Sequence, residues 1–433
     1  MRHLLFCLLL LIVPDPLYAD LKNYIQKPEP KARWELKKKQ ELDSGTIYSI
    51  HFISQEWQTI TWEHELVVYY PKKVKPHATM FLWVTGGKPS MGSTVQAYDL
   101  ALKMHAPVAF LFDIPNQPLL DGKKEDTLIA ETFTRYLKSK DEDWPLLFPM
   151  VKSVIKAMDI LQEFSKKEWQ TELAHFVIAG ASKRGWTSWL TGSTGDPRVR
   201  AIAPMVIDTL NMMKQMPHQI ESYGAPSQAI EDYLKRELVP IPDTPEAKKL
   251  WRMVDPWSYR SKLLMPKLIV NGTNDPYWTQ DALNLYWEDL AGDKWLLYVP
   301  NAGHGLDQKE QNRKHRTRAV NTVAVFARMQ IEGTRLPVLK WSHEGTTHCT
   351  LKVQSQPAPK AARIWSTTAP TRDFRKATWK DQSLDIKEGR ISYECEPPAD
   401  GFRVFFAECE YELDGLPYYL STQLRIIGAS KNK

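Results

Sequence analysis

Residues 174–185 read A-H-F-V-I-A-G-A-S-K-R-G, an apolar strand pattern that runs into a serine at the start of a helical pattern. In a nucleophile elbow, a serine takes the strained turn between strand and helix, and the helix N-terminus favours an oxyanion. The usual spacing is G-x-S-x-G, whereas here Arg184 stands two residues after Ser182 and the glycine follows at Gly185. The strand-turn-helix context favours a nucleophile, although a serine that only caps a helix would give the same pattern.

Five other runs share the apolar character of this strand. Each is short and ends in polar residues or glycine: Thr79–Thr85, Val108–Ile114, Ala201–Ile207, Lys267–Asn271 and Trp295–Val299. Helical spacing lies between several of them, as at Ser93–His105 and Met150–Phe164. Strands that alternate with helices form a parallel sheet buried on both faces. The sequence therefore predicts a doubly wound α/β sheet, with a β-rich stretch at 46–70 before it.

Two departures from this alternation predict the domain organisation. Residues 209–265 are too long for a simple crossover and predict a helical insertion, which either fills a core or shapes a substrate site. The helical segment Gln308–Ile331 is expected to end at Gly333. From Pro337 onward short strand patterns recur: Ala362–Trp365, Arg390–Glu394, Phe402–Glu408 and Leu420–Ile427. We expect an α/β domain over residues 20–335 and a small β-sandwich-like domain over 336–433.

The composition excludes several classes of protein. The chain has 433 residues, with 43% hydrophobic and 25% charged residues, which is typical of a folded protein of two or three domains. Its net charge of +6 is small for this length, and no basic run exceeds Lys37–Lys39. Nucleic acid is therefore not an expected partner.

The beginning of the chain has the pattern of a secretory signal peptide. Arg2 and His3 precede the apolar run Leu4–Val13, and L-Y-A follows at 17–19. That run is too short to span a membrane, which takes about 20 residues. We expect removal of residues 1–19 and an exported protein, periplasmic or extracellular, without stable membrane insertion.

Three cysteines would remain after that cleavage: Cys349, Cys395 and Cys409. An exported chain permits one disulfide among them, and their odd number leaves one thiol over. Their spacing does not resemble that of a metal site, so no metal is expected there.

Two later strand exits carry the groups that activate a serine. The strand Lys267–Asn271 runs into G-T-N-D-P, which contains Asp275, and the strand Trp295–Val299 runs into P-N-A-G-H-G, which contains His304. A serine hydroxyl is a weak nucleophile until an imidazole accepts its proton, and a carboxylate must fix the imidazole tautomer. The order serine, aspartate, histidine is that of α/β-hydrolases. Asp208, at the exit of an earlier strand, is the alternative acid.

The same reasoning predicts an oxyanion hole and substrate contacts. The backbone N–H of Lys183 is the first expected donor, and the loop at Gly86 and Gly87 supplies the second. These two glycines could instead only end a strand. Substrate contacts are expected from side chains near the serine and the acid in sequence, although tryptophans more often fill cores: Arg184, Trp186, Trp257 and Trp278.

Three longer stretches resemble a known family: G-A-S-K-R-G-W-T-S-W-L from Gly180, P-K-L-I-V-N-G-T-N-D-P-Y-W from Pro266 and Y-V-P-N-A-G-H from Tyr298. They are similar to the PhoPQ-activated pathogenicity-related protein family of exported bacterial proteins, over roughly residues 40–425. The resemblance implies an α/β-hydrolase fold with the serine, aspartate and histidine at matching positions, and no defined substrate. The serine turn is also similar to that of glucuronoyl esterases, in which a basic residue follows the nucleophile.

Together these residues predict a secreted serine hydrolase that needs no metal or cofactor, with an esterase favoured. A peptidase or amidase on the same scaffold is the alternative enzyme. A non-catalytic glycan- or protein-binding protein that retains the fold is the alternative from another class. The expected partner is a small molecule, a glycan ester or a peptide, and the sequence leaves the oligomeric state open.

Overall fold

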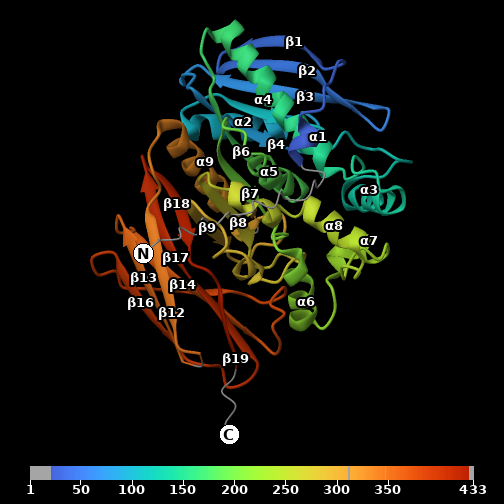
Figure 1. Ribbon diagram of the computed structural model, residues 1–433. Helices are drawn as coiled ribbons and strands as arrows, with labels where there is room; N and C mark the ends of the chain where they lie inside the picture. The colour runs from blue at the N-terminus through green and yellow to red at the C-terminus, as the bar shows by residue number, and fades with distance from the viewer. Residues whose placement is uncertain (1–20, 311–312, 347, 429–433) are drawn as a thin grey trace, which may run out of the picture.

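The structure is a computed structural model that describes residues 21–310, 313–346 and 348–428 (Figure 1). Its largest element is a nine-stranded sheet in the order β1-β2-β3-β5-β4-β6-β7-β8-β9. Six of these strands run parallel to one another: β4 (Thr79–Val84), β5 (Val108–Leu111), β6 (His175–Ala181), β7 (Val199–Met205), β8 (Lys267–Gly272) and β9 (Lys294–Val299). The predicted α/β sheet is therefore confirmed, whereas the expected signal peptide lies outside the described residues.

The β-rich stretch before the parallel strands is larger than expected. It forms three long antiparallel strands, β1 (Arg33–Leu42), β2 (Gly45–Trp57) and β3 (Ile60–Pro71), after the short helix α1 (Leu21–Ile25). The strand β3 then pairs with β5, also antiparallel. The sequence did not predict β1 because its residues are mostly charged and exposed, as is usual for an edge strand protected against further pairing.

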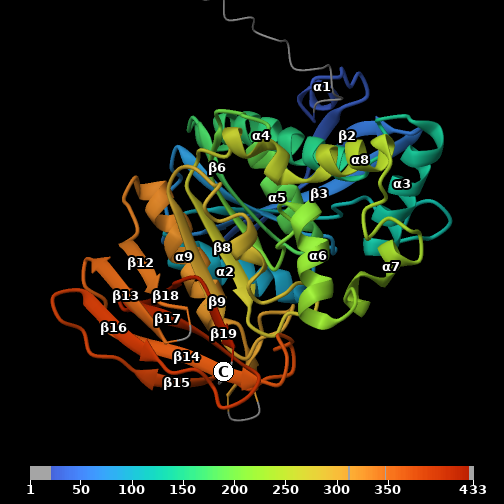
Figure 2. The same cartoon turned by 60° about the horizontal axis from the view of Figure 1, so that its bottom comes forward.

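Both faces of the parallel strands are buried, which explains their continuous apolar sequences. In β6, Phe176 and Ile178 pack on one face, while Val177 and Ala179 pack on the other. Figure 2 shows the helices on the two sides of the sheet. The first face carries α4 (Leu147–Trp169) and α5 (Lys183–Ser193), and the second carries α2 (Met91–Met104) and α9 (Thr317–Glu332).

The region 209–265 is helical, as predicted. It contains α6 (Met212–Tyr223), η1 (Gln228–Ile230), α7 (Glu231–Leu234), α8 (Pro245–Val254) and η2 (Pro256–Lys262). The carboxylate of Asp255 joins the two ends of this region, because it accepts the backbone N–H groups of Asn211, Met212 and Trp257 at 3.1, 2.8 and 2.9 Å. Burial raises the pKa of Asp255 to about 7, against the effect of these donors.

The helix expected over Gln308–Ile331 begins later than predicted. Residues Gln308–Glu310 and Arg313–His315 form the short strands β10 and β11, and α9 begins only at Thr317. The run between Gln308 and Arg316 is polar and has no apolar helical period, so no helix face could be buried there. The predicted end is correct, because Gly333 caps α9 with φ of 73°.

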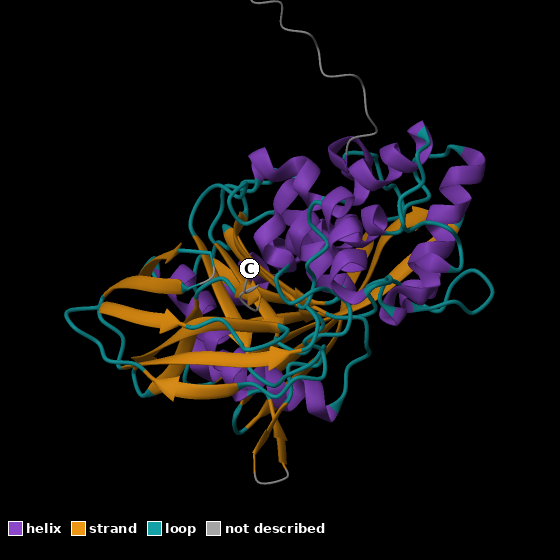
Figure 3. Ribbon diagram, turned by 90° about the horizontal axis from the view of Figure 1, so that it is seen from below, coloured by secondary structure: helices purple, strands orange, loops and turns teal. Residues whose placement is uncertain are grey.

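The chain after Pro337 forms two further antiparallel groups of strands, which gather on one side of the molecule in Figure 3. One comprises β12 (Val338–Glu344), β13 (Cys349–Gln356) and β16 (Arg390–Cys395), and the other comprises β14 (Ala361–Ala369), β15 (Lys380–Ser383), β17 (Phe402–Leu413), β18 (Leu416–Ser421) and β19 (Arg425–Gly428). The strand expected over Leu420–Ile427 is thus divided between β18 and β19. Cys349 and Cys395 lie opposite each other on β13 and β16, and all three described thiols are free.

The C-terminal strands pack directly on the parallel sheet. The ring centres of Tyr298 and Phe406 lie 5.4 Å apart, and the Tyr298 backbone N–H donates to Ser421 Oγ at 3.0 Å. The helix α9 adds a buried ion pair between Arg318 and Glu408. Apolar packing is therefore continuous across the predicted domain boundary, and two separately folding units remain a prediction.

Candidate active site

Ser182 occupies a strained turn between β6 and α5, with φ of 57° and ψ of −126°. Two glycines allow this turn to approach its neighbours. A Cβ on Gly180 would lie 2.5 Å from the Arg184 carbonyl oxygen, and a Cβ on Gly185 would lie 2.6 Å from Ile207 Cγ2. The glycine three residues after the serine is therefore needed where α5 meets the sheet, which accounts for the unusual spacing.

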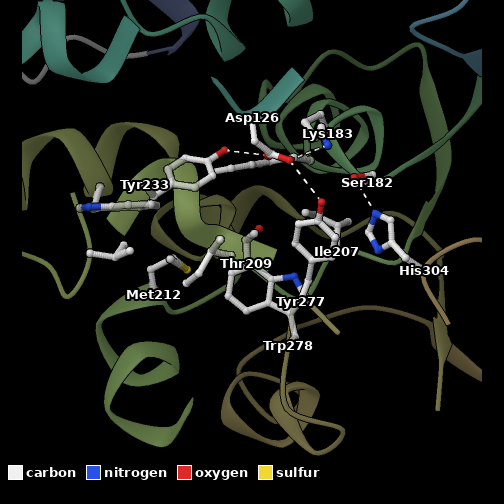
Figure 4. A pocket seen from close by; sticks show the side chains of 14 residues that line it. Asp126, Ser182, Lys183, Ile207, Thr209, Met212, Tyr233, Tyr277, Trp278 and His304 are labelled. Atoms are coloured by element: carbon white, nitrogen blue, oxygen red, sulfur yellow. Dashed lines mark hydrogen bonds and ion pairs between the residues drawn. The ribbon is translucent and has the colours of Figure 1, made fainter. Parts of the chain in front are cut away.

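The structure brings together the serine, histidine and aspartate predicted from sequence. Ser182 Oγ lies 2.9 Å from His304 Nε2, and His304 Nδ1 lies 2.8 Å from Asp275 Oδ2 (Figure 4 shows the first of these contacts). A carboxylate only accepts hydrogen bonds, so Nδ1 carries the proton and the Nε2 lone pair faces the serine hydroxyl. Asp275 Oδ1 accepts the Tyr277 backbone N–H at 2.9 Å, and the Tyr277 ring lies 4.3 Å from the His304 ring. This arrangement can take a proton from the Ser182 hydroxyl.

The alternative acid, Asp208, has other partners. It accepts a hydrogen bond from Asn271 Nδ2 at 2.8 Å and another from the Tyr286 hydroxyl. Burial raises its pKa to about 6, against these two hydrogen bonds. The structure places Asp275, not Asp208, beside the imidazole.

The two basic residues after Ser182 pair with two acids that begin α3 (Glu125–Ser139). Lys183 Nζ lies 2.8 Å from Asp126, and the Arg184 guanidinium binds Glu125 through two hydrogen bonds of 2.6 and 2.7 Å. Burial would raise the pKa of Glu125, but the hydrogen bonds and charge of Arg184 lower it to about 2. Arg184 is thus engaged within the protein and is absent from the lining of the cavity described below, contrary to its expected contact with substrate.

The expected oxyanion donors lie in two places. The Lys183 N–H is the first of α5, a position that has no acceptor within a helix. Gly86 packs against Arg184, because a Cβ there would lie 1.6 Å from a guanidinium nitrogen. Gly87 is exposed, and its N–H lies 3.5 Å from Thr85 Oγ1. The glycine loop is therefore coupled to the serine turn through the side chain of Arg184.

A small cavity lies beside Ser182 and His304 (Figure 4). Most of its wall is apolar or aromatic: Trp186, Ile207, Met212, Ile230, Tyr233, Val239, Trp251, Tyr277 and Trp278. Trp186 and Trp278 thus lie where a substrate contact was expected. Trp257 does not line the cavity: its indole N–H donates to Asp289 at 2.9 Å, and the Arg260 guanidinium lies 3.8 Å from its ring centre.

Comparison with known proteins places the chain in a family. The sequence model of the PhoPQ-activated pathogenicity-related protein family matches residues 21–375. The chain belongs to this family. It is also 32% identical to the autocrine proliferation repressor protein A of Dictyostelium discoideum over 453 aligned residues, which cover 95% of this chain and 90% of that protein.

A solved structure shows the same fold. Acetyl xylan esterase 1 from Thermoanaerobacterium matches 72% of this family member, over 91% of its own chain, with a TM-score of 0.50 and 13% identity. This likeness shows that this member of the PhoPQ-activated pathogenicity-related protein family has the α/β-hydrolase fold.

Three residues of the site in this family member were not predicted from sequence. Asp126 accepts hydrogen bonds from the hydroxyls of Tyr233 and Tyr277, at 3.1 and 3.3 Å, besides its ion pair with Lys183. Burial raises the pKa of both tyrosines, and the neighbouring Asp126 adds to this effect. The acidic pair at 125–126 is a recognised signal of a helix start, and this signal could have indicated α3.

Two kinds of feature are absent from the described residues. Within residues 21–310, 313–346 and 348–428, no group of three or more His, Cys, Asp or Glu side chains is placed to hold a metal ion. None of the helices in these ranges is both long and apolar enough to span a membrane.

Proposed function

We propose that this protein is a serine hydrolase that cleaves carboxylic esters. The observation that carries the proposal is the chain of two hydrogen bonds from Ser182 through His304 to Asp275, on the strained turn before α5. A protein that only binds ligands has no need of a strained serine aligned with an imidazole and a carboxylate. An ester is favoured because the adjoining cavity is small and largely apolar, which suits one compact substrate group.

The reaction would proceed in two steps. As Ser182 Oγ bonds to the ester carbonyl carbon, its proton moves to His304 Nε2, and Asp275 stabilises the imidazolium. The electron pair of the carbonyl collects on oxygen, facing the Lys183 N–H and the N-terminus of α5. Collapse of this intermediate breaks the bond to the leaving alkoxide, which takes the proton from His304. Water then repeats the sequence on the acyl-serine and releases the acid.

We further propose that the enzyme acts after export. The basic start and apolar run of residues 1–19 support this location. A mature N-terminus near Asp20, found by sequencing the protein from a secreting host, would support it.

The test is labelling with a fluorophosphonate probe together with hydrolysis of p-nitrophenyl butyrate. Wild type should react in both assays, and Ser182→Ala should lose both while its melting temperature stays within a few degrees. Ser193→Ala is the matched control, because Ser193 lies on the same helix and donates only to the Trp189 carbonyl, at 2.9 Å. A folded wild type that is inert in both assays, or a folded Ser182→Ala that retains activity, contradicts the proposal.

A further inference from the structure

The cavity beside Ser182 contains two polar side chains without a partner. Thr209 Oγ1 and Trp278 Nε1 are buried, and neither has a hydrogen-bond partner within the described parts of the chain. Both residues line the cavity and are more than nine-tenths buried, with 1% and 7% of their surface exposed. Figure 4 shows them together below Asp126 and Lys183.

The other polar side chains that line this cavity have partners. The two remaining tryptophans make the clearest comparison, because Trp186 Nε1 donates to the Val254 carbonyl at 2.6 Å and Trp251 Nε1 donates to the Leu238 carbonyl at 3.2 Å. The other six are hydrogen-bonded to one another. Lys183, Tyr233 and Tyr277 each donate to Asp126, and Ser182 bonds to His304. Folded proteins satisfy the great majority of their buried polar groups, so two unpaired groups in one cavity wall indicate that the occupant supplies the partner.

The chemistry of the pair defines that partner. An indole N–H only donates, and a threonine hydroxyl both donates and accepts. An oxygen atom with free lone pairs can therefore accept from either group. The occupant is uncharged, because Asp126 and Lys183 already neutralise each other and the rest of the wall is apolar, so a buried substrate charge would have no counter-ion.

We infer that this site selects esters that carry an uncharged oxygen, such as a ketone, hydroxyl or ether, on the apolar group that enters the cavity. Thr209 and Trp278 are the specificity-determining residues. The inference rests on the proposed ester hydrolysis and adds the class of substrate. An occupant without the oxygen leaves both polar groups unpaired, and enzymes built to hydrogen-bond a substrate discriminate strongly against analogues that lack the bonding group.

The test compares matched esters that differ only in this oxygen. One series is p-nitrophenyl heptanoate and its keto analogues, with the ketone moved one carbon at a time from the fourth carbon to the sixth. A second series places the same chains on the alcohol side of the ester, as heptyl acetate and keto-heptyl acetates. Hydrolysis of this series is measured by titration of the released acid. In one of the two series, the kcat/KM of wild type for the best keto ester should exceed its kcat/KM for the hydrocarbon ester by about tenfold or more.

Thr209→Val and Trp278→Phe should each bring the ratio of kcat/KM between keto and hydrocarbon esters close to one. Each substitution removes one hydrogen-bonding group and keeps most of the shape of the side chain. Trp251→Phe is the control: it removes an N–H that already has a protein partner, so the ratio between keto and hydrocarbon esters should persist. A wild type that hydrolyses all esters of both series within about twofold of one another overturns the inference and leaves the proposed function intact.

Binding of the same esters to Ser182→Ala, measured by calorimetry, separates the two proposals. A keto preference in binding without turnover by wild type supports the pocket assignment and contradicts ester hydrolysis. Equal binding of keto and hydrocarbon esters contradicts the pocket assignment, whether or not wild type shows turnover.

Discussion

The parallel sheet and the C-terminal region contribute to the candidate site in different ways. The loops after β6, β8 and β9 supply Ser182, Asp275 and His304, and none of the described residues after His304 lines the cavity. The C-terminal region instead contacts the loops themselves. Asn274 Nδ2 donates to the carbonyls of Arg375 and Ala377, at 3.2 and 2.7 Å.

The loop that carries the histidine is held in the same way. Asn301 Nδ2 donates to the Trp379 carbonyl at 3.0 Å, and the Trp379 N–H donates back to Asn301 Oδ1 at 2.7 Å. Asn274 immediately precedes the acid, and Asn301 lies three residues before His304. One region therefore provides the side chains of the proposed triad, while the backbone of another bonds to the two loops that carry Asp275 and His304.

The largest effect should come from the reactive side chains. Asp275→Asn keeps the shape of the carboxylate but lets the imidazole adopt the wrong tautomer, so kcat should fall by about 10⁴. Asp208→Asn should cost far less, because Asp208 bonds Asn271 and Tyr286. Steady-state assays of both variants, with melting temperatures, test this ranking. The reverse order would transfer the role of acid to Asp208.

A smaller effect should come from the contacts made by the C-terminal region. Asn301→Ala and Asn274→Ala each release a loop from the segment 375–379, and the resulting misalignment of His304 or Asp275 should lower kcat by about tenfold, with little change in KM. Asn284→Ala is the matched control, because Asn284 Nδ2 also donates to a C-terminal carbonyl, that of Leu424 at 3.0 Å, but lies outside both loops.

Melting temperature separates positioning from stability in these variants. All three asparagine substitutions should destabilise the fold by a similar amount, about 1 kcal/mol each, since each removes hydrogen bonds to backbone carbonyls. Only the first two should lower kcat. If Asn284→Ala lowers kcat as much as Asn301→Ala does, the C-terminal region contributes to stability alone.

This division explains which parts of the site were predictable from sequence. The six parallel strands and the order of Ser182, Asp275 and His304 depend on local patterns, namely short apolar runs that end in a polar turn. The contacts of Asn274 and Asn301 join residues about 80 to 100 positions apart, and no local pattern indicates such a partner. Whether a side chain enters the cavity is equally a matter of tertiary packing.

Arg184 and Trp257 show this limit most clearly. Both lie near the site in sequence, and both were expected to contact substrate. Arg184 instead extends from α5 to Glu125 at the start of α3, a helix that is not among those predicted from sequence. Trp257 lies on η2, where its indole N–H donates to Asp289, and it does not line the cavity.

The smallest effect should therefore follow replacement of Trp257, which belongs to neither of the two regions compared above. Trp257→Phe removes an exposed hydrogen bond and keeps an aromatic ring beside Arg260, so kcat/KM should stay within about twofold of wild type and stability within about 0.5 kcal/mol. Trp186→Phe is the informative counterpart, because it leaves the buried Val254 carbonyl without its donor and should cost about 1–3 kcal/mol. Denaturant unfolding and ester kinetics on both variants make the comparison. A large loss of kcat/KM in a fully folded Trp257→Phe would mean that η2 moves over the cavity when substrate binds, and the helical region 209–265 would then join the sheet loops as part of the site.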